Sequence, residues 1–364
     1  MAMAKAAAKK KLKVGIIGVG GISGVHFSGY SKCEDSELWA ICDIKPDVLK
    51  QKSELYKVPK ERCFLDHREL LKLKEIDAVS VTTPNKAHCE ITVNALKAGK
   101  HVLCEKPMAM NAREGQKMVD TAKQCKRILQ IGLMQRFRGD VNYIKQIVDD
   151  GTLGDIYYAR CQAIRRRGVP SWGVFGQKEE NGGGGLLDIG VHAIDLTWYA
   201  MGMPRPVAVS GSLYKTIGNT PGHWGIFGEW DWKTYTVEDF VYGMVRFANG
   251  ATMSIECGFI VNLDRPREGF HLAGTKGGAG IDPLNVQLEL NGHLMDCTPQ
   301  DVMNVHKTNK PANIGTHELE IEHFCDCILH NKPTRVPATD IIWVQKIMDG
   351  LYASAKAKKE IKIV

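Results

Sequence analysis

The chain has 364 residues, enough for two domains of ordinary size, and its formal charge is +7. Lysines near the two ends carry this excess, and the sequence between them is close to neutral. Only Arg165–Arg167 resembles a basic cluster, which argues against a nucleic-acid partner. No run reaches about 18 consecutive apolar residues and the first residues contain no apolar signal segment, so we expect no membrane partner.

The eleven cysteines are scattered along the chain. Only Cys325 and Cys327 are close neighbours, and zinc ribbons and redox motifs do not use that spacing. Scattered thiols are typical of a reducing compartment. We therefore expect a cytoplasmic protein without a metal site.

The first third of the chain alternates strand-like and helix-like segments. Short, β-branched apolar runs, which are typical of parallel strands covered on both faces, occupy residues 13–18, 36–43, 77–83, 101–106 and 127–132. Amphipathic segments lie between them, such as a helix predicted over 85–98 and ended by Gly99. The alternation predicts a doubly wound parallel sheet over residues 14–134, preceded by a basic tail at 1–13.

The pattern changes in the remainder, residues 135–364. Longer alternating runs are joined by Asn-Gly pairs at 249–250 and 291–292, which is a strong hairpin signal. A largely apolar helix is predicted over 186–199, and a surface helix with a basic end from Asp340 to Lys359. We therefore predict a second domain of α+β type, with a mostly antiparallel sheet and helices on one face.

A glycine-rich turn, GIIGVGGIS, follows the first predicted strand. Gly18 permits the tight turn of a dinucleotide fingerprint, and Gly20 lets the backbone approach a diphosphate. Ser23 stands at the third position, where a small residue keeps helix and strand close. The positive end of the following helix would then face the phosphates.

Asp43 ends the second predicted strand, 20 residues after Ser23. A carboxylate at this point accepts hydrogen bonds from both ribose hydroxyls and repels a 2′-phosphate, which favours NAD(H) over NADP(H). The alternative is that Asp43 only starts a turn before Pro46. The neighbouring Lys45 would soften the discrimination.

The segment GGGGLLDIGVHAIDLTWY at 182–199 carries polar residues on one line of an apolar helix. Asp188, His192, Asp195 and Tyr199 follow at spacings of four, three and four, which places them on one stripe. One buried histidine alone is usually a satisfied core residue, but four polar residues together favour a site. We interpret Asp195 and Tyr199 as structural partners, because a metal site here would lack further ligands.

Glu105 and Lys106, in HVLCEKPMAM, end the fourth predicted strand, where open α/β sheets bind their ligands. From position alone, Lys106 fits a surface residue as well as a site residue. The EKP motif combined with GGxLxDxGxHxxD resembles the Gfo/Idh/MocA family of sugar and cyclitol oxidoreductases. The resemblance covers nearly the whole chain, from GIIGVGGIS through TTPNKAH and CEKPMAM to GGGGLLDIGVHAIDL and the closing helix.

The resemblance implies a Rossmann domain, a C-terminal domain with a large open sheet often used for oligomerisation, and a nicotinamide cofactor. It implies catalytic roles for Lys106, Asp188 and His192. The expected cofactor-binding positions are Gly18, Gly20, Gly21, Ile22, Ser23, Asp43, Thr82, Thr83, Asn85, His88, Glu105, Lys106 and Gln135. The expected substrate positions are Arg165, Arg167, Trp172, Lys178, Asp188 and His192.

The chemistry of these side chains agrees with such roles. The imidazole of His192 is suited to take the hydroxyl proton of a carbinol near neutral pH as hydride leaves. The ammonium of Lys106 is suited to stabilise the developing negative charge on that oxygen. Asp188 would orient the imidazole or anchor a neighbouring sugar hydroxyl.

Tryptophans concentrate in one later segment, where Trp224, Trp230 and Trp232 lie within nine residues. Aromatic side chains on glycine-rich loops suit sugar rings or aromatic aglycones, and they suit a subunit interface equally well. Lys178 fits a solvated loop as well as a substrate contact. The middle segment resembles oxidoreductases of pyranosides, including glycoside 3-dehydrogenases, more than small-cyclitol enzymes.

We therefore expect an NAD(H)-dependent oxidoreductase that moves hydride between nicotinamide and a ring carbinol of a sugar or glycoside, with the 3-position of a pyranoside as the candidate. A homo-oligomer (dimer, tetramer or hexamer) is expected. The alternatives are an inositol 2-dehydrogenase, a redox-neutral glycosidase that keeps NAD bound, and a non-enzymatic NAD-binding regulator. Regulators on enzyme folds tend to lose the catalytic set, which this chain retains.

Overall fold

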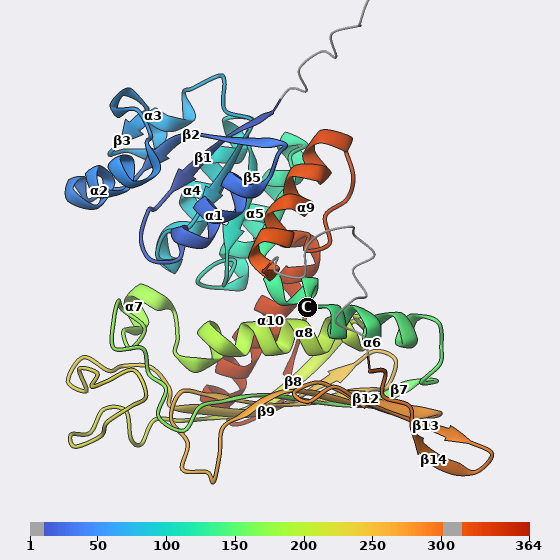
Figure 1. Ribbon diagram of the computed structural model, residues 1–364. Helices are drawn as coiled ribbons and strands as arrows, with labels where there is room; N and C mark the ends of the chain where they lie inside the picture. Colours follow the sequence, from blue (N-terminus) through green and yellow to red (C-terminus); the bar gives the residue numbers. More distant parts are fainter. Residues whose placement is uncertain (1–10, 301–314) are drawn as a thin grey trace, which may run out of the picture. The chain divides into compact units, whose positions relative to one another are not determined.

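The computed structural model describes residues 11–300 and 315–364, which fall into two compact units (Figure 1). The chain passes to the second unit after Glu105, returns to the first over Lys117–Gly132, and enters the second again at Leu133. The described residues 315–338 belong to the first unit. The predicted domain boundary at 134/135 is thus close to the point, Leu133, where the chain enters the second unit again. Residues 106–116 were expected in the first unit but belong to the second, and residues 315–338 were expected in the second unit but belong to the first. The basic tail falls outside the described residues up to residue 10, and Leu12 and Lys13 already belong to a strand.

The first unit contains the predicted doubly wound parallel sheet. Its strand order is β3-β2-β1-β4-β5-β6, that of a Rossmann fold. The strands are β1 (Leu12–Ile17), β2 (Ser36–Cys42), β3 (Cys63–Phe64), β4 (Ala78–Val81), β5 (His101–Glu105) and β6 (Leu129–Gly132). The five predicted strands are confirmed. The edge strand β3 was not predicted, because two residues show no periodicity.

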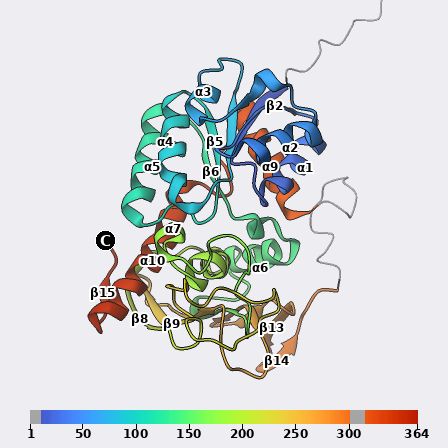
Figure 2. The ribbon, with the colours of Figure 1, turned by 90° about the vertical axis from the view of Figure 1, so that its left-hand side faces the viewer.

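Helices cover both faces of this sheet, with α4 and α5 on one side and α1, α2 and α9 on the other (Figure 2). The helices are α1 (Ser23–Lys32), α2 (Pro46–Tyr56), α3 (His67–Leu71), α4 (Asn85–Lys97), α5 (Ala112–Cys125) and α9 (Thr316–His330), with the 3₁₀ turn η1 (Lys60–Arg62). Gly99 follows α4 with a φ of +79°, as predicted for a residue that ends a helix.

Helix α9 completes the core of the first unit from a distant part of the chain. Ile321, Phe324 and Cys325 of α9 are buried in the same cluster as Phe27 of α1. The two helices approach so closely that any side chain on Gly29 of α1 would collide with Ile321. The core of the dinucleotide fold therefore depends on residues that lie almost 200 positions beyond β6.

The second unit is built on a mixed, mostly antiparallel sheet of order β14-β13-β12-β11-β7-β10-β9-β8-β15. Its strands are β7 (Ile156–Ile164), β8 (Pro206–Tyr214), β9 (Phe240–Phe247), β10 (Thr252–Gly258), β11 (Arg267–Gly274), β12 (Gly277–Gly280), β13 (Asn285–Leu290), β14 (His293–Asp296) and β15 (Ile361–Lys362). Only β7 and β10 pair in parallel. Both predicted Asn-Gly hairpins are present, and Asn291 and Gly292 both have positive φ, as a type I′ turn requires.

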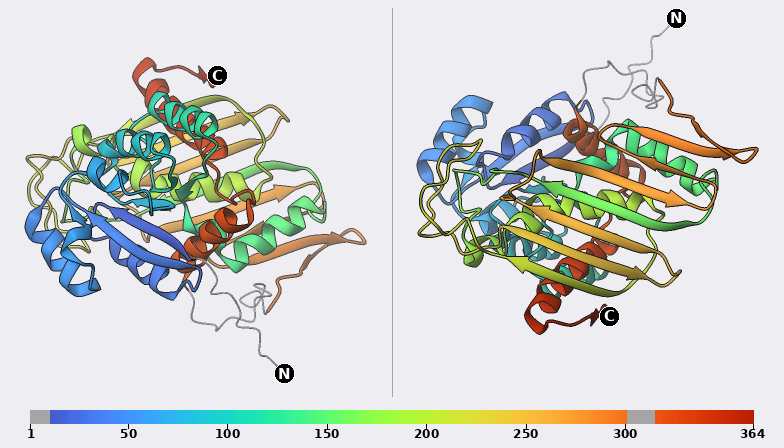
Figure 3. Two further views of the ribbon diagram at one scale, coloured as in Figure 1. Left: turned by 90° about the horizontal axis from the view of Figure 1, so that it is seen from above. Right: turned by 90° about the horizontal axis from the view of Figure 1, so that it is seen from below.

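Helices pack on one face of this sheet, and none of the helices in residues 11–300 and 315–364 lies on the other face (Figure 3). They are η2 (Met134–Phe137), α6 (Gly139–Asp149), α7 (Lys178–Asn181), η3 (Leu186–Gly190), α8 (Val191–Ala200) and α10 (Ala338–Ala357). The predicted surface-packed closing helix is α10, which buries Val344, Ile347 and Leu351 and exposes its basic end. It fits closely because Gly211 and Gly243 of the sheet leave space for Leu351.

The eleven cysteines are all free thiols, as predicted. Within the described part of the chain, every helix is too short or too polar to cross a membrane.

Candidate active site

The glycine-rich turn after β1 has the geometry of a dinucleotide-binding loop. Gly18 has a φ of +89°, and a Cβ there would lie 2.8 Å from the Thr83 backbone nitrogen. Only glycine fits this position without strain. The hydroxyl of Thr82 donates hydrogen bonds to the carbonyl oxygens of Ile17 and Gly18, which ties the loop to the end of β4.

The next residues leave open space at the start of α1. A Cβ on Gly20 or Gly21 would meet no atom within 4 Å, and both glycines are exposed. Ile22 is partly exposed, whereas Ser23 is buried and donates from its hydroxyl to the Gly20 carbonyl oxygen at 2.6 Å. Accessible backbone at the positive end of a helix fits the diphosphate of NAD.

Asp43 follows β2 beside this loop. Its Oδ2 accepts a hydrogen bond from the Val19 N–H at 2.8 Å, and its Oδ1 accepts one from the Lys45 N–H at 2.9 Å. The turn considered as an alternative is therefore present. Each carboxylate oxygen can accept a further hydrogen bond, so Asp43 also fits the ribose hydroxyls of NAD.

The other predicted cofactor residues of the first unit follow β4 and β5. His88 Nε2 donates to the Thr83 carbonyl oxygen at 2.8 Å, and Asn85 begins α4. Glu105 is buried and accepts a hydrogen bond from His26 Nε2 at 2.9 Å. No motif indicated His26, since its contact with Glu105 spans 79 residues. Carboxyl ends of parallel strands are where doubly wound sheets bind dinucleotides.

Replacing Gly20 with alanine is expected to weaken NAD binding by about ten- to a hundredfold without changing the melting temperature. The added methyl meets no protein atom but occupies the space of the diphosphate, so at least one charge-assisted hydrogen bond of about 1.5–3 kcal/mol is lost. Calorimetric titration with NAD measures this effect. Gly24, inside α1, is the matched control because its Cβ is equally unobstructed. Equal NAD affinity of both variants would contradict the placement of the cofactor.

In the second unit, Lys106 forms an ion pair with Asp188. The ammonium donates to Asp188 Oδ1 at 2.7 Å and to the Asp188 carbonyl oxygen at 3.1 Å. The two side chains are only 19% and 11% exposed. The sequence indicated that Asp188 orients an imidazole or binds a sugar hydroxyl. The structure adds a contact that was not anticipated, in which Asp188 fixes the position of the lysine.

The segment that carries Asp188 is not the uniform α-helix that was predicted. Leu186–Gly190 form a π-helical turn before α8, so the 3.6-residue periodicity applies only from Val191 onward. π-helical turns are rare and frequently occur at functional sites. Asp188 thus projects from a wider turn than His192 does.

Glu238 anchors the start of this π-helical turn. Its carboxylate accepts hydrogen bonds from the Gly184 and Leu186 N–H groups and from the Tyr352 hydroxyl. Burial raises the pKa of the Glu238 carboxyl above its usual range. The glycine run lets the chain pass close to β10, since a Cβ on Gly185 would lie 2.8 Å from the Gly258 Cα atom.

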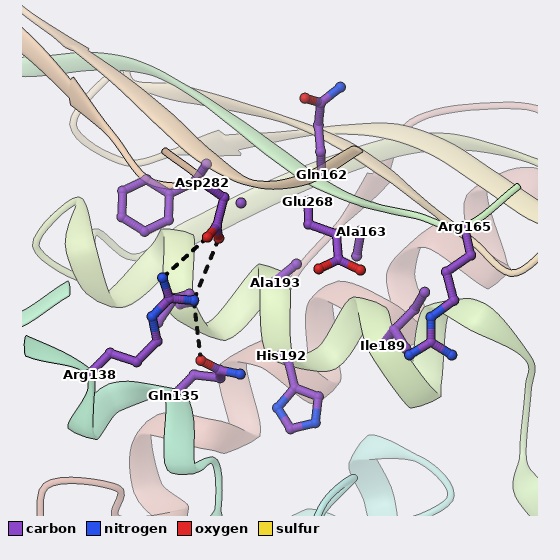
Figure 4. A pocket seen from close by; sticks show the side chains of 13 residues that line it. Gln135, Arg138, Gln162, Ala163, Arg165, Ile189, His192, Ala193, Glu268 and Asp282 are labelled. Atoms are coloured by element: carbon purple, nitrogen blue, oxygen red, sulfur yellow. Dashed lines mark hydrogen bonds and ion pairs between the residues drawn. The ribbon is translucent and has the colours of Figure 1, made fainter. Parts of the chain in front are cut away.

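His192 lines a half-open cavity of about 170 Å³ between α8 and the sheet (Figure 4). Glu268 of β11 and Arg165, which follows β7, extend from the sheet toward α8 in this view. The cavity is lined by Gln135, Arg138, Gln162, Ala163, Arg165, Ile189, His192, Ala193, Leu196, Glu268, Gly269, Phe270 and Asp282. Polar groups on an apolar wall are typical of a small-molecule site.

The predicted substrate residues divide into two groups. Arg165 and His192 line this cavity, as does Gln135, which was predicted to bind the cofactor. Trp172 and Lys178 form the second group, which does not line this cavity. Trp172 is exposed and contacts Phe227 edge-on, and Lys178 lies near the Tyr352 ring.

Four polar residues of the cavity lining were not predicted: Arg138, Gln162, Glu268 and Asp282. Gln162 and Glu268 lie on strands whose alternating pattern resembles that of ordinary sheet residues. Asp282 lies 3.4 Å from the Arg138 guanidinium and follows a strand without any local motif. Nothing in their sequence neighbourhood indicated a site.

Asp195 and Tyr199, interpreted as structural, surround a buried arginine. Arg136 donates to both carboxylate oxygens of Asp195, and its side chain and that of Asp195 are almost completely buried. The guanidinium lies 4.7 Å from the centre of the Tyr199 ring. Burial raises the pKa of the Asp195 carboxyl, and the charge of Arg136 opposes that shift. The pair holds α8 against η2, which carries Arg136.

Replacing Arg136 with methionine is expected to lower the free energy of unfolding by about 3–5 kcal/mol, because Asp195 then remains buried without its cation. Urea denaturation measures this loss. Arg246, whose ion pair with Glu360 lies at the surface, is the control, and its replacement should cost less than about 1 kcal/mol. Similar losses in both variants would contradict the structural importance of the buried pair.

A metal site on the stripe was the other interpretation of these acidic residues. In the described ranges, no group of three or more His, Cys, Asp or Glu side chains is arranged to hold a metal ion. Asp188 is engaged by Lys106, and Asp195 by Arg136.

One unit has a Rossmann fold with a glycine-rich loop. The other has an aspartate that is paired with a lysine and lies four residues before a cavity-lining histidine. Together these features define the class of dinucleotide-dependent oxidoreductases. Two models of that class match the sequence: an oxidoreductase family with an NAD-binding Rossmann fold over residues 12–133, and a C-terminal domain of the same family over 141–279. The chain belongs to the Gfo/Idh/MocA oxidoreductase family, and its cofactor is NAD.

Similar proteins agree with this membership over the full length. A D-glucoside 3-dehydrogenase of Escherichia coli is 34% identical, with 99% of this chain and 100% of that protein covered. An aldose-aldose oxidoreductase from Caulobacter crescentus, crystallised with glycerol, is 26% identical with a TM-score of 0.79 over 97% of this chain and 100% of its own. A levoglucosan dehydrogenase in complex with NADH shares the fold, with 24% identity and a TM-score of 0.85 over 98% of this chain and 100% of its own.

Proposed function

We propose that this protein oxidises a ring carbinol of a glycoside with NAD⁺, with the 3-position of a pyranoside as the reacting carbon. The observation that carries the proposal is the ion pair between Lys106 and Asp188, because Asp188 lies in the π-helical turn that leads directly into α8 and its cavity-lining His192. The full-length similarity to a D-glucoside 3-dehydrogenase supports the choice of substrate class.

The residues of the first unit would hold the cofactor. Gly20 and Gly21 leave room for the diphosphate, and Asp43, which the Val19 N–H holds beside the loop, would accept hydrogen bonds from the ribose. An unmodified ribose is required, because a 2′-phosphate would be repelled by the Asp43 carboxylate. The chemistry supplied by bound NAD⁺ is the acceptance of hydride from the carbinol carbon.

The residues of the second unit remove the proton from the reacting oxygen and stabilise the negative charge that develops on it. His192 takes the hydroxyl proton as the C–H bond breaks, so that the carbinol becomes a ketone. Lys106 donates a hydrogen bond to the same oxygen and stabilises its partial negative charge. Asp188 keeps the ammonium in place, since it binds Lys106 at 2.7 Å. In the reverse direction His192 returns the proton.

The polar cavity wall suits a sugar ring. Arg165 and Glu268 extend from the sheet toward α8 and present donors and acceptors to this cavity. The cavity is half open, which leaves an exit for the substituent at the anomeric carbon of a glycoside.

A panel of glycosides, free sugars and inositols with NAD⁺, followed by the near-ultraviolet absorbance of NADH, tests the proposal. We expect the highest kcat/KM with a pyranoside, and a ketone at its 3-position in the product spectrum. Activity confined to inositols would replace the proposal with an inositol 2-dehydrogenase. Absence of NADH formation with every compound would favour a regulator.

A second candidate is suggested by the aldose-aldose oxidoreductase among the similar structures. An enzyme that keeps its cofactor would pass hydride between two sugars, and a redox-neutral glycosidase would also retain NAD. The absorbance spectrum of the purified protein distinguishes these cases, because a retained cofactor remains after gel filtration and shows no net turnover in solution.

Two further predictions belong with this function. The helix-free face of the nine-stranded sheet, with exposed Tyr158 and Tyr242, supports a homo-oligomer of two, four or six chains. The free thiols support a cytoplasmic location. Light scattering measures the first, and cell fractionation the second.

A further inference from the structure

A second cavity adjoins the one that contains His192. It measures about 690 Å³ and shares Arg165 and Glu268 with the first cavity, so the two cavities meet at these side chains. Its remaining wall comes from Arg166, Arg167 and the segment Trp224–Phe227, with further contributions from residues 261–266. A volume of this size is typical of a cavity that accommodates a substantial organic group.

The apolar part of this second cavity is built into an ordered loop. The Ile226 N–H donates to the Arg167 carbonyl oxygen at 2.9 Å, which fixes the loop tip beside the arginine run. Farther along the loop, Trp230 is buried and donates to the Gly218 carbonyl oxygen at 2.8 Å. Asp239 accepts hydrogen bonds from three consecutive backbone N–H groups, those of residues 216–218, at the base of the loop.

This anchoring leaves large apolar side chains exposed in a fixed position. Trp224 is 69% exposed and Ile226 is 68% exposed. Rigidly held apolar surface of this kind marks a binding site more often than chance exposure does. The loop contributes an aromatic face and an aliphatic side chain to the cavity wall, which suits a planar apolar group.

The charged part of the cavity favours an anion. Three arginines, Arg165–Arg167, and a single carboxylate, that of Glu268, line the cavity. Arg167 donates to the Asn262 side chain, and Arg165 lies 5.4 Å from the centre of the Phe227 ring, so both are oriented by neighbours. Arginine combines planar stacking with bidentate binding of carboxylates.

We propose that this second cavity is an aglycone subsite for a planar apolar group that carries a carboxylate. The inference rests on the proposed function, because the sugar ring would occupy the cavity beside His192 while its anomeric substituent extends past Arg165. The substrates would accordingly be aryl glycosides with an acidic substituent.

Kinetics with three probes test the subsite: methyl, phenyl and 4-carboxyphenyl β-glucosides. We expect the KM to decrease in that order. Replacing Trp224 with alanine should raise the KM of both aryl glucosides by about two- to tenfold and leave that of methyl glucoside unchanged. Replacing Arg166 with glutamine should remove the preference for the carboxylate, and salt should weaken that preference in the native protein.

Trp232 lies in the same loop but does not line the cavity, so replacing it with alanine is the matched control. Equal KM values for the three glucosides, in the native protein and all variants, would overturn the subsite while leaving glycoside oxidation intact. Calorimetric binding of 4-carboxyphenyl glucoside that depends on Trp224, without NADH formation, would retain the subsite and reject the proposed function. A change of oligomeric mass on replacing Trp224 would identify the loop as a subunit interface and overturn the subsite, and absence of binding and turnover would overturn both proposals.

Discussion

Replacing His192 with alanine is expected to lower kcat by about two to four orders of magnitude, which is the usual contribution of a positioned general base. The hydroxyl proton would then have to leave to water. The loss should appear in kcat more than in KM, since Arg165, Gln162 and Glu268 still line the cavity. The acid limb of the kcat/KM profile should disappear in the same variant, because no imidazole remains to titrate. Stopped-flow measurement of NADH formation between pH 5 and pH 9 checks both outcomes.

The control for this variant is His293→Ala. His293 is an exposed residue of β14 and lies outside the cavity. Its replacement should leave the rate and the pH profile unchanged. If the His192 variant turned over at a near-native rate, the proton would have to leave by another group, and the assignment of the base would be wrong.

Replacing Lys106 with methionine should reduce kcat by about two to three orders of magnitude, the range seen when one donor to a developing oxyanion is removed. The variant also leaves Asp188 without its cation, so the π-helical turn loses a contact. Arginine at this position should not restore the rate, because a planar guanidinium does not reproduce the compact ammonium. Steady-state kinetics, with far-ultraviolet circular dichroism to verify folding, measure the effect.

Lys356→Met, near the exposed end of α10, is the matched control. Asp188→Asn separates the two functions of the pair, since it keeps the shape and removes the negative charge. We expect this variant to lower kcat less than the loss of Lys106 does. A rate in the Lys106 variant equal to that of the control would remove the lysine from the mechanism.

Local patterns predicted the parts of this fold that depend on neighbouring residues. The apolar runs identified the five longer strands of the first sheet, because parallel strands bury both faces. The Asn-Gly pairs identified two hairpins, because such pairs readily supply the positive φ of a tight turn, at Gly250 in one hairpin and at Asn291 and Gly292 in the other. The glycine fingerprint identified the loop at Gly18 for the same conformational reason.

Contacts between distant residues could not be predicted. The partner of Asp195 is Arg136, 59 residues earlier, and nothing in the local sequence of either residue indicates the other. Lys106 and Asp188 are 82 residues apart, so motif order suggested a common site but not their ion pair. The π-helical turn was also missed, because its wider spacing resembles ordinary helical periodicity over five residues. Glu268 reaches the cavity only through the pairing of β11 with β7, which places it beside Ala163.

The return of α9 to the first unit has a consequence for biosynthesis. A ribosome must add almost 200 residues after β6 before α9 can cover Phe27 and its neighbours. At elongation rates of about 5–20 residues per second this takes roughly ten to forty seconds, during which the nascent dinucleotide fold has an incomplete core. The first unit therefore cannot complete its core before the chain has been synthesised as far as α9. During this interval chaperones can bind the apolar surface that α9 later covers.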